Sequence, residues 1–190
     1  MATKPKIKVK LTDHNFEKMK NKKNKYIVIH YTGDVGATAQ NELDYFHSAG
    51  SKKAQASANY FVDTDIIGES VKPENKAWHC GGGLQDYGKK YGGATRHNIC
   101  LNSNSIGIEM CVFKKKGKIY LPFAEYKRVK ELVKWLMDKY DIPVSHVIRH
   151  KDVTGKCCPD CYTELKNGKL SKTTLLNNKH WKHWRKGLCK

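Results

Sequence analysis

An uninterrupted apolar run near the N-terminus constrains the fold of this chain more than any other feature. Residues 26–29 read Tyr-Ile-Val-Ile, and the run continues through His30 and Tyr31 to a stop at Gly33. A β-branched run without polar alternation predicts a strand that is buried on both faces at the centre of a sheet. Because such a strand needs a covering layer on each side, the run favours an α/β fold.

Other segments fit the same architecture. The clearest helix is predicted over residues 124–140, where apolar residues recur at three- and four-residue spacing. A shorter helix is predicted over 38–49 with Thr38 as its N-cap. Further strands are expected at 7–11 on an edge, at 60–62 with 66–67 as its hairpin partner, at 105–112 and at 147–148. We expect one α/β domain with a mixed central sheet flanked by helices.

The flanks of this domain are basic. Residues 1–25 are predicted to be a lysine-rich lead-in, residues 26–162 the domain, and residues 163–190 a basic helical tail with Trp181 and Trp184 on one helix face. Residues 81–93 form a glycine-rich loop that lacks the Gly-Lys-Ser/Thr ending of a phosphate-binding loop. We expect that loop to border a substrate groove.

Net charge restricts the partners. The chain has 36 Lys and Arg against 18 Asp and Glu, a formal net charge of +18. Such a surface favours a polyanion, whether nucleic acid, an anionic membrane or a cell-wall polymer, and the alternative is a solvated lysine-rich surface. Lysine predominates and no basic recognition helix is present, which argues against specific nucleic-acid binding.

No apolar run approaches membrane-spanning length, and no secretory signal is evident, so we expect synthesis in a cytoplasm.

Two histidines and a cysteine cluster indicate metal chemistry. His30 and His150 each follow a predicted strand, and Cys158 lies eight residues beyond His150. Two histidines and one thiolate with an open fourth position are typical of a catalytic zinc site. The alternative is that the histidines belong to the core and that the seven cysteines are inert thiols.

Five segments in fixed order carry a resemblance to a known family. The segments are Ile27–Thr32, Ala56–Asp63, Ala77–Gly81, Asn104–Glu109 and Arg149–Pro159. With these segments the chain resembles the zinc-dependent N-acetylmuramoyl-L-alanine amidases of the type 2 family, which includes the peptidoglycan recognition proteins. Within that family it resembles in particular the amidase endolysins of phages and prophages of clostridia and bacilli.

The resemblance implies one zinc ion per chain, held by His30, His150 and Cys158. The family places its third ligand directly before a proline, and Pro159 follows Cys158, so Cys158 is preferred to Cys157.

The resemblance also implies roles around the metal. Glu109 is expected to transfer protons, and Lys156 to stabilise the oxyanion of the tetrahedral intermediate. Trp78 and His79 are expected to face the substrate. Ala58 stands where some members carry a catalytic tyrosine, which leaves the proton transfer to Glu109.

The function implied by the resemblance is hydrolysis of the amide between N-acetylmuramic acid and L-alanine in peptidoglycan. The expected setting is a phage or prophage endolysin that is made in the host cytoplasm and lyses a Gram-positive cell after release, with anionic wall polymers as further partners. Two alternatives remain: a cytosolic amidase that recycles muropeptides, and a non-catalytic peptidoglycan-binding module.

Overall fold

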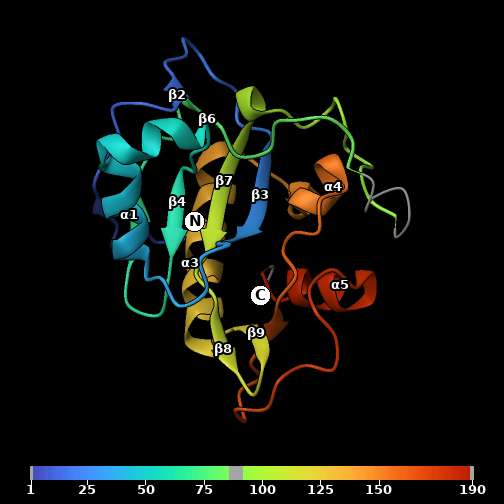
Figure 1. Ribbon diagram of the computed structural model, residues 1–190. Coiled ribbons are helices and arrows are strands. Elements are labelled where there is room, and N and C mark those ends of the chain that lie inside the picture. Colours follow the sequence, from blue (N-terminus) through green and yellow to red (C-terminus); the bar gives the residue numbers. More distant parts are fainter. Residues whose placement is uncertain (1, 86–91, 189–190) are drawn as a thin grey trace.

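A six-stranded mixed sheet forms the centre of the molecule (Figure 1). The computed structural model describes residues 2–85 and 92–188, so part of the predicted glycine-rich loop, residues 86–91, lies outside the described residues. The strand order is β1-β5-β4-β7-β3-β10, with β4 and β5 antiparallel and the other neighbours parallel. The predicted α/β class and mixed sheet are confirmed.

The strands and helices are named in chain order, as in Figure 1. The strands are β1 (Lys8–Val9), β2 (Phe16–Glu17), β3 (Tyr26–Tyr31), β4 (Tyr60–Val62), β5 (Ile67–Glu69), β6 (Lys76–Ala77), β7 (Ser105–Met110), β8 (Phe113–Lys115), β9 (Lys118–Leu121), β10 (Val147–Arg149) and β11 (Tyr162–Thr163). The helices are α1 (Ala39–His47), α3 (Phe123–Tyr140), α4 (His150–Thr154) and α5 (Asn178–Lys186), with 3-10 turns η1 (Ala49–Ala54), η2 (Asn102–Asn104) and η3 (Val144–His146).

Strand β3 lies between β7 and β10, as its apolar run predicts. Side chains alternate along a strand, so Ile27 and Ile29 point to one face while Val28 and His30 point to the other. Residue 30 pairs with residue 109 of β7 in the parallel register. His30 and Glu109 therefore lie side by side on one face of the sheet.

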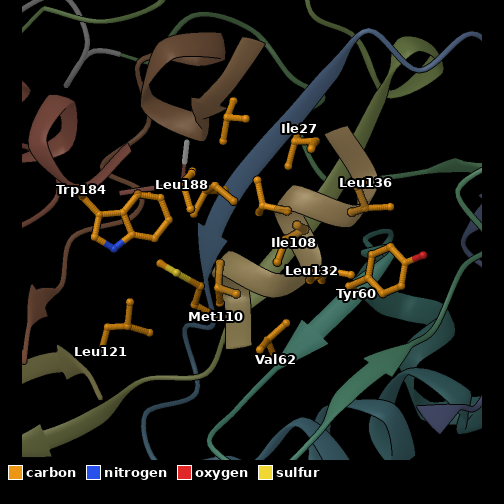
Figure 2. Close-up of a cluster of buried hydrophobic side chains, with 14 of the residues drawn as sticks. Ile27, Tyr60, Val62, Ile108, Met110, Leu121, Leu132, Leu136, Trp184 and Leu188 are labelled. Carbon is orange, nitrogen blue, oxygen red and sulfur yellow. The ribbon is translucent and has the colours of Figure 1, made fainter. Parts of the chain in front are cut away.

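Helix α3 covers the opposite face. Its residues Val129, Leu132 and Leu136 are fully buried and pack against side chains from β3, β4 and β7. Figure 2 shows this cluster and labels Ile27 and Ile108 of the sheet together with Leu132 and Leu136 of the helix. The three- and four-residue spacing predicted this buried face.

Helix α1 and the short helix α4 lie on the sheet face that carries His30 and Glu109, on either side of β3 and β7 (Figure 1). Thr38 caps α1 as predicted: its hydroxyl accepts the Asn41 N–H, and the Asn41 side chain accepts the Thr38 N–H. This capping box satisfies two backbone groups that the first turn leaves without partners.

The two basic flanks pack on the domain. Strand β1 pairs with β5 at the sheet edge, and β2 pairs with β6. In the C-terminal segment, Trp181, Trp184 and Leu188 are buried in the same cluster as the α3 face. Among the described residues, no helix combines the length and apolar character needed to cross a bilayer.

Candidate metal centre and active site

Three metal-ligand side chains converge at the C-terminal ends of β3 and β10. His30 belongs to β3, His150 begins α4, and Cys158 lies in the loop after α4. One donor atom from each lies within 4.8 Å of the other two, and all three residues are buried. Two imidazole nitrogens and one thiolate, with room for a fourth ligand, are a donor set that suits catalytic zinc. The residues therefore fit the metal that the sequence predicts.

Burial prepares the two histidines for metal binding. It lowers the pKa of His150 to about 3 and holds the pKa of His30 well below its ordinary value. A neutral imidazole offers a lone pair, so neither ring has to lose a proton before it binds a metal. Burial acts in the other direction on Cys158, whose thiol pKa it raises, while the Tyr31 N–H donated to the sulfur favours the thiolate.

A chain of hydrogen bonds determines which nitrogen of His30 faces the site. Ser105 Oγ donates to the Leu101 carbonyl oxygen at 2.6 Å, so it accepts from His79 Nε2 at 3.2 Å. His79 Nδ1 is then an acceptor, and His30 Nε2 donates to it at 3.1 Å. His30 Nδ1 keeps the lone pair and lies 3.9 Å from Cys158 Sγ. The chain therefore presents Nδ1 as the ligand atom.

Strand β7 makes room for His79 through a glycine. A Cβ atom at Gly107 would lie only 2.5 Å from the His79 ring. The His79 ring is buried and meets the His30 ring edge-on, with the two ring centroids 5.2 Å apart. Both ring nitrogens of His79 form hydrogen bonds, one to Ser105 and one to His30. His79 therefore orients the His30 ring, a role that sequence reasoning missed. Its predicted contact with substrate stays a prediction.

The structure brings Cys158, rather than Cys157, to the two histidines. Within the described residues the ligand cluster contains Cys158 alone among the cysteines. Cys157 instead donates from its Sγ to Asp160 Oδ2 at 3.4 Å. This geometry agrees with the preference for the cysteine that precedes Pro159.

Glu109 lies next to the metal ligands. Its Oε1 is 3.8 Å from His30 Nδ1, and its buried Oε2 has no hydrogen-bond partner among the described residues. Burial, with the Glu42 carboxylate adding to it and Lys156 opposing it, raises the pKa of Glu109 to about 8. A carboxyl group with a pKa near neutrality is suited to accept and return a proton.

All seven predicted site residues line one cavity of about 570 Å³. Lys156 is exposed there, and its charge lowers the pKa of Glu109 and of both histidines. The backbone N–H of Trp78 donates to Ser57 Oγ at 2.9 Å, which fixes the backbone of Trp78 at the cavity.

Glu42 is a cavity residue that sequence reasoning missed. It lies in α1 and is 8% exposed, and burial, with Asp34 adding to it, raises its pKa to about 7. On a helix of mixed polarity a glutamate is expected to face solvent, so no sequence signal marked this position.

Comparison with known proteins agrees with this geometry. The sequence profile of the Amidase_2 family, described as N-acetylmuramoyl-L-alanine amidase, matches residues 20–161. The chain belongs to this family. It is 35% identical over 162 residues to the N-acetylmuramoyl-L-alanine amidase CwlL of Bacillus licheniformis, a match that covers 82% of this chain and 42% of CwlL. The chain thus spans less than half the length of that relative.

Solved structures share the amidase fold. The catalytic domain of XlyA superimposes with a TM-score of 0.67 at 22% identity, covering 97% of this chain and 99% of that one. A mutant endolysin from Bacillus subtilis superimposes with a TM-score of 0.65 at 24% identity, covering 96% and 98%. At these identities the likeness concerns the fold.

Proposed function

We propose that this chain is a zinc-dependent amidase that hydrolyses the bond between N-acetylmuramic acid and L-alanine in peptidoglycan. The observation that carries the proposal is the convergence of His30, His150 and Cys158 beside the carboxyl group of Glu109, in one open cavity. Membership of the amidase family supports the choice of reaction.

The three ligands would hold zinc, which supplies Lewis-acid chemistry by polarising an amide carbonyl and activating water. Glu109 removes a proton from the attacking water and delivers it to the leaving amine nitrogen. General acid–base transfer of this kind typically contributes ~10²–10⁴-fold to rate. Its raised pKa suits both steps, since the group must change protonation state twice in each turnover.

Lys156 supplies a positive charge at the cavity. Its side chain is exposed at the cavity that holds the ligands and Glu109. An ammonium group there stabilises the oxyanion that develops when water adds to the carbonyl, and one such contact is worth ~3 kcal/mol in comparable sites. Trp78 provides an apolar wall for the substrate.

The reaction is tested by identifying the bond cleaved. Purified peptidoglycan is digested with zinc-loaded protein, and new amino groups are labelled and identified. We expect L-alanine N-termini without new reducing sugar ends, and no release by the Glu109→Gln protein. New reducing ends would contradict the proposal. Cleavage of soluble muropeptides alone would favour the recycling amidase, and binding without cleavage would favour the recognition module.

We propose further that the protein is a phage or prophage endolysin that acts on the Gram-positive wall after release from the cytoplasm. The likeness to endolysin structures and the net charge of +18 support this setting. The positive surface would bind anionic wall polymers. Lys179 and Lys182 of α5 are exposed on the side away from the buried tryptophans and would contribute.

Salt dependence tests the wall-binding role. Lysis of whole cells should fall as salt rises from 0.01 to 0.15 M, because the Debye length shrinks from ~30 to ~8 Å, while cleavage of a soluble muropeptide should change little. The Lys179→Gln/Lys182→Gln protein should lyse cells less well at low salt. A matched Lys114→Gln/Lys116→Gln protein changes the charge equally at the β8–β9 hairpin. Equal salt dependence for both substrates would contradict a targeting role for charge.

A further inference from the structure

Two cysteines outside the metal centre lie together behind it. Cys80 directly follows His79, and Cys100 precedes η2. Both are thiols and are at most 4% exposed, and both belong to one small core cluster with Val28, Ile148 and Val153. Both also line a separate cavity of about 260 Å³. Neither residue has a part in the proposed amidase chemistry.

We propose that Cys80 and Cys100 are an oxidisable thiol pair that forms an intrachain disulfide with a peroxide as oxidant.

The backbone around the two thiols is already tied together. Asn102 Oδ1 accepts the N–H of Cys80 at 2.8 Å and the N–H of His79 at 3.1 Å. One side chain two residues beyond Cys100 therefore holds the segment that carries Cys80. A disulfide needs the two Cα atoms within about 7 Å, and the contacts through Asn102 favour such an approach.

The surroundings favour a reactive thiolate at Cys80. The Cys100 thiol donates a hydrogen bond to the Cys80 sulfur, which lowers the pKa of Cys80 and raises that of Cys100. The half-buried Lys22 ammonium donates to the Ser105 carbonyl oxygen at 2.7 Å, and its charge interacts with both thiols. A nearby cation and hydrogen-bond donors are the features of reactive cysteines.

The chemistry balances with one peroxide per disulfide. The Cys80 thiolate attacks one oxygen of hydrogen peroxide, the O–O bond breaks, and the products are a sulfenic acid and, after protonation, water. Cys100 then attacks the Cys80 sulfur, the S–S bond forms, and the sulfenic hydroxyl leaves as a second water. Two thiols lose two protons and two electrons, and the peroxide takes them up to become two waters.

The bond would limit the freedom of the unfolded chain. It would also fix the segment that carries His79. Its timing rests on the proposed function, because an endolysin moves from a reducing cytoplasm to the cell exterior, but the thiol chemistry does not. A protein that forms the disulfide and fails to cleave peptidoglycan would contradict only the proposed function.

Mass spectrometry tests the pair directly. Zinc-loaded protein is treated with hydrogen peroxide, alkylated, and digested with trypsin without reduction. We expect peptides 77–89 and 97–114 to appear as a linked pair that dithiothreitol separates. Fragment ions distinguish Cys100 from Cys111 in the second peptide, so the assignment needs no variant. Oxidised protein should also melt at a higher temperature than reduced protein.

Two matched variants sharpen the result. Cys100→Ser should abolish the link and leave a Cys80 sulfenic acid that dimedone traps, whereas Cys111→Ser, in the same tryptic peptide, should keep the link. The proposal is overturned if Cys80 and Cys100 remain alkylatable after peroxide treatment. It is also overturned if peroxide links Cys157 and Cys161 instead, or if Cys80 becomes sulfinic acid without forming a bond.

Discussion

The two histidines of the metal centre are held by different parts of the chain. His30 lies inside a six-stranded sheet, where strands on both sides fix its backbone and the His79–Ser105 chain fixes its ring. His150 begins a five-residue helix, α4, which has no such frame of its own. The metal site thus joins a rigid half with a half that depends on contacts from elsewhere.

The C-terminal segment supplies those contacts. On one side of His150, the Arg149 guanidinium donates to the carbonyl oxygens of Leu175 and Leu176 and to Asn178 Oδ1. On the other side, Lys151 Nζ donates to the Leu176 carbonyl oxygen at 3.1 Å. Residues 175–178 lie beyond the family match at 20–161. The segment that the sequence presents as a basic tail therefore helps to position a metal ligand.

The largest expected effect concerns the ligand that joins the two halves. Cys158→Ser should abolish zinc binding and amidase activity, because a site with three protein ligands does not survive the loss of its thiolate. Cys157→Ser is the matched control and should keep both. Zinc content by elemental analysis and release of L-alanine amines measure the outcome. An inactive Cys157→Ser protein would show that the third ligand is misassigned.

Glu109 belongs to the rigid half, and its loss should affect chemistry without affecting the metal. Glu109→Gln should retain zinc and lower kcat by ~10²–10⁴-fold, since an amide cannot accept the proton. Steady-state kinetics and zinc content are measured on the same preparation. A kcat near that of the wild-type protein would remove Glu109 from the mechanism.

The support of His30 is tested next. His79→Ala should weaken zinc binding by about 10- to 100-fold, the usual cost of losing a residue that orients a metal ligand. Ser105→Ala should have a smaller effect in the same direction, because it acts through His79. Competition with a chromophoric chelator measures the affinity. Unchanged affinity in both variants would refute the proposed positioning chain.

Removing one residue that supports His150 should weaken zinc binding less than removing His79, because several hydrogen bonds together hold the backbone around His150. Asn178→Ala and Lys151→Met should each weaken zinc binding by up to about tenfold, the lower end of the range for residues around metal ligands. Lys182→Met, on the exposed face of α5, is the control and should leave affinity unchanged. A loss in Lys151→Met larger than that in His79→Ala would reverse the comparison between the two halves.

Much of the rigid half could be predicted from sequence. The apolar run of β3 and the spacing in α3 determine which faces are buried, and the family motifs mark His30 and Glu109 as site residues, although their pairing on neighbouring strands comes from the structure. Local pattern is informative there because each face of a strand or helix repeats with a fixed period.

The rest depends on contacts between residues distant in sequence. The pairing of Arg149 with residues 175–178 joins segments that carry no shared pattern: a family motif includes Arg149, but the motif does not reveal its partners. His79 is similar: its motif marks the position, but its two hydrogen-bond partners are set by the packing of η2 and β7. Short strands such as β2 and β6 were also missed, because two residues carry too little periodicity to be recognised.

The central claim is that one zinc ion, held by His30, His150 and Cys158, makes this chain an amidase. The most direct measurement is a titration of metal-free protein with zinc while amine release from peptidoglycan is followed. The account predicts activity that rises linearly and reaches a plateau at one zinc per chain, with no activity before zinc is added. Full activity in the metal-free protein, or no activity at any zinc level, would contradict it.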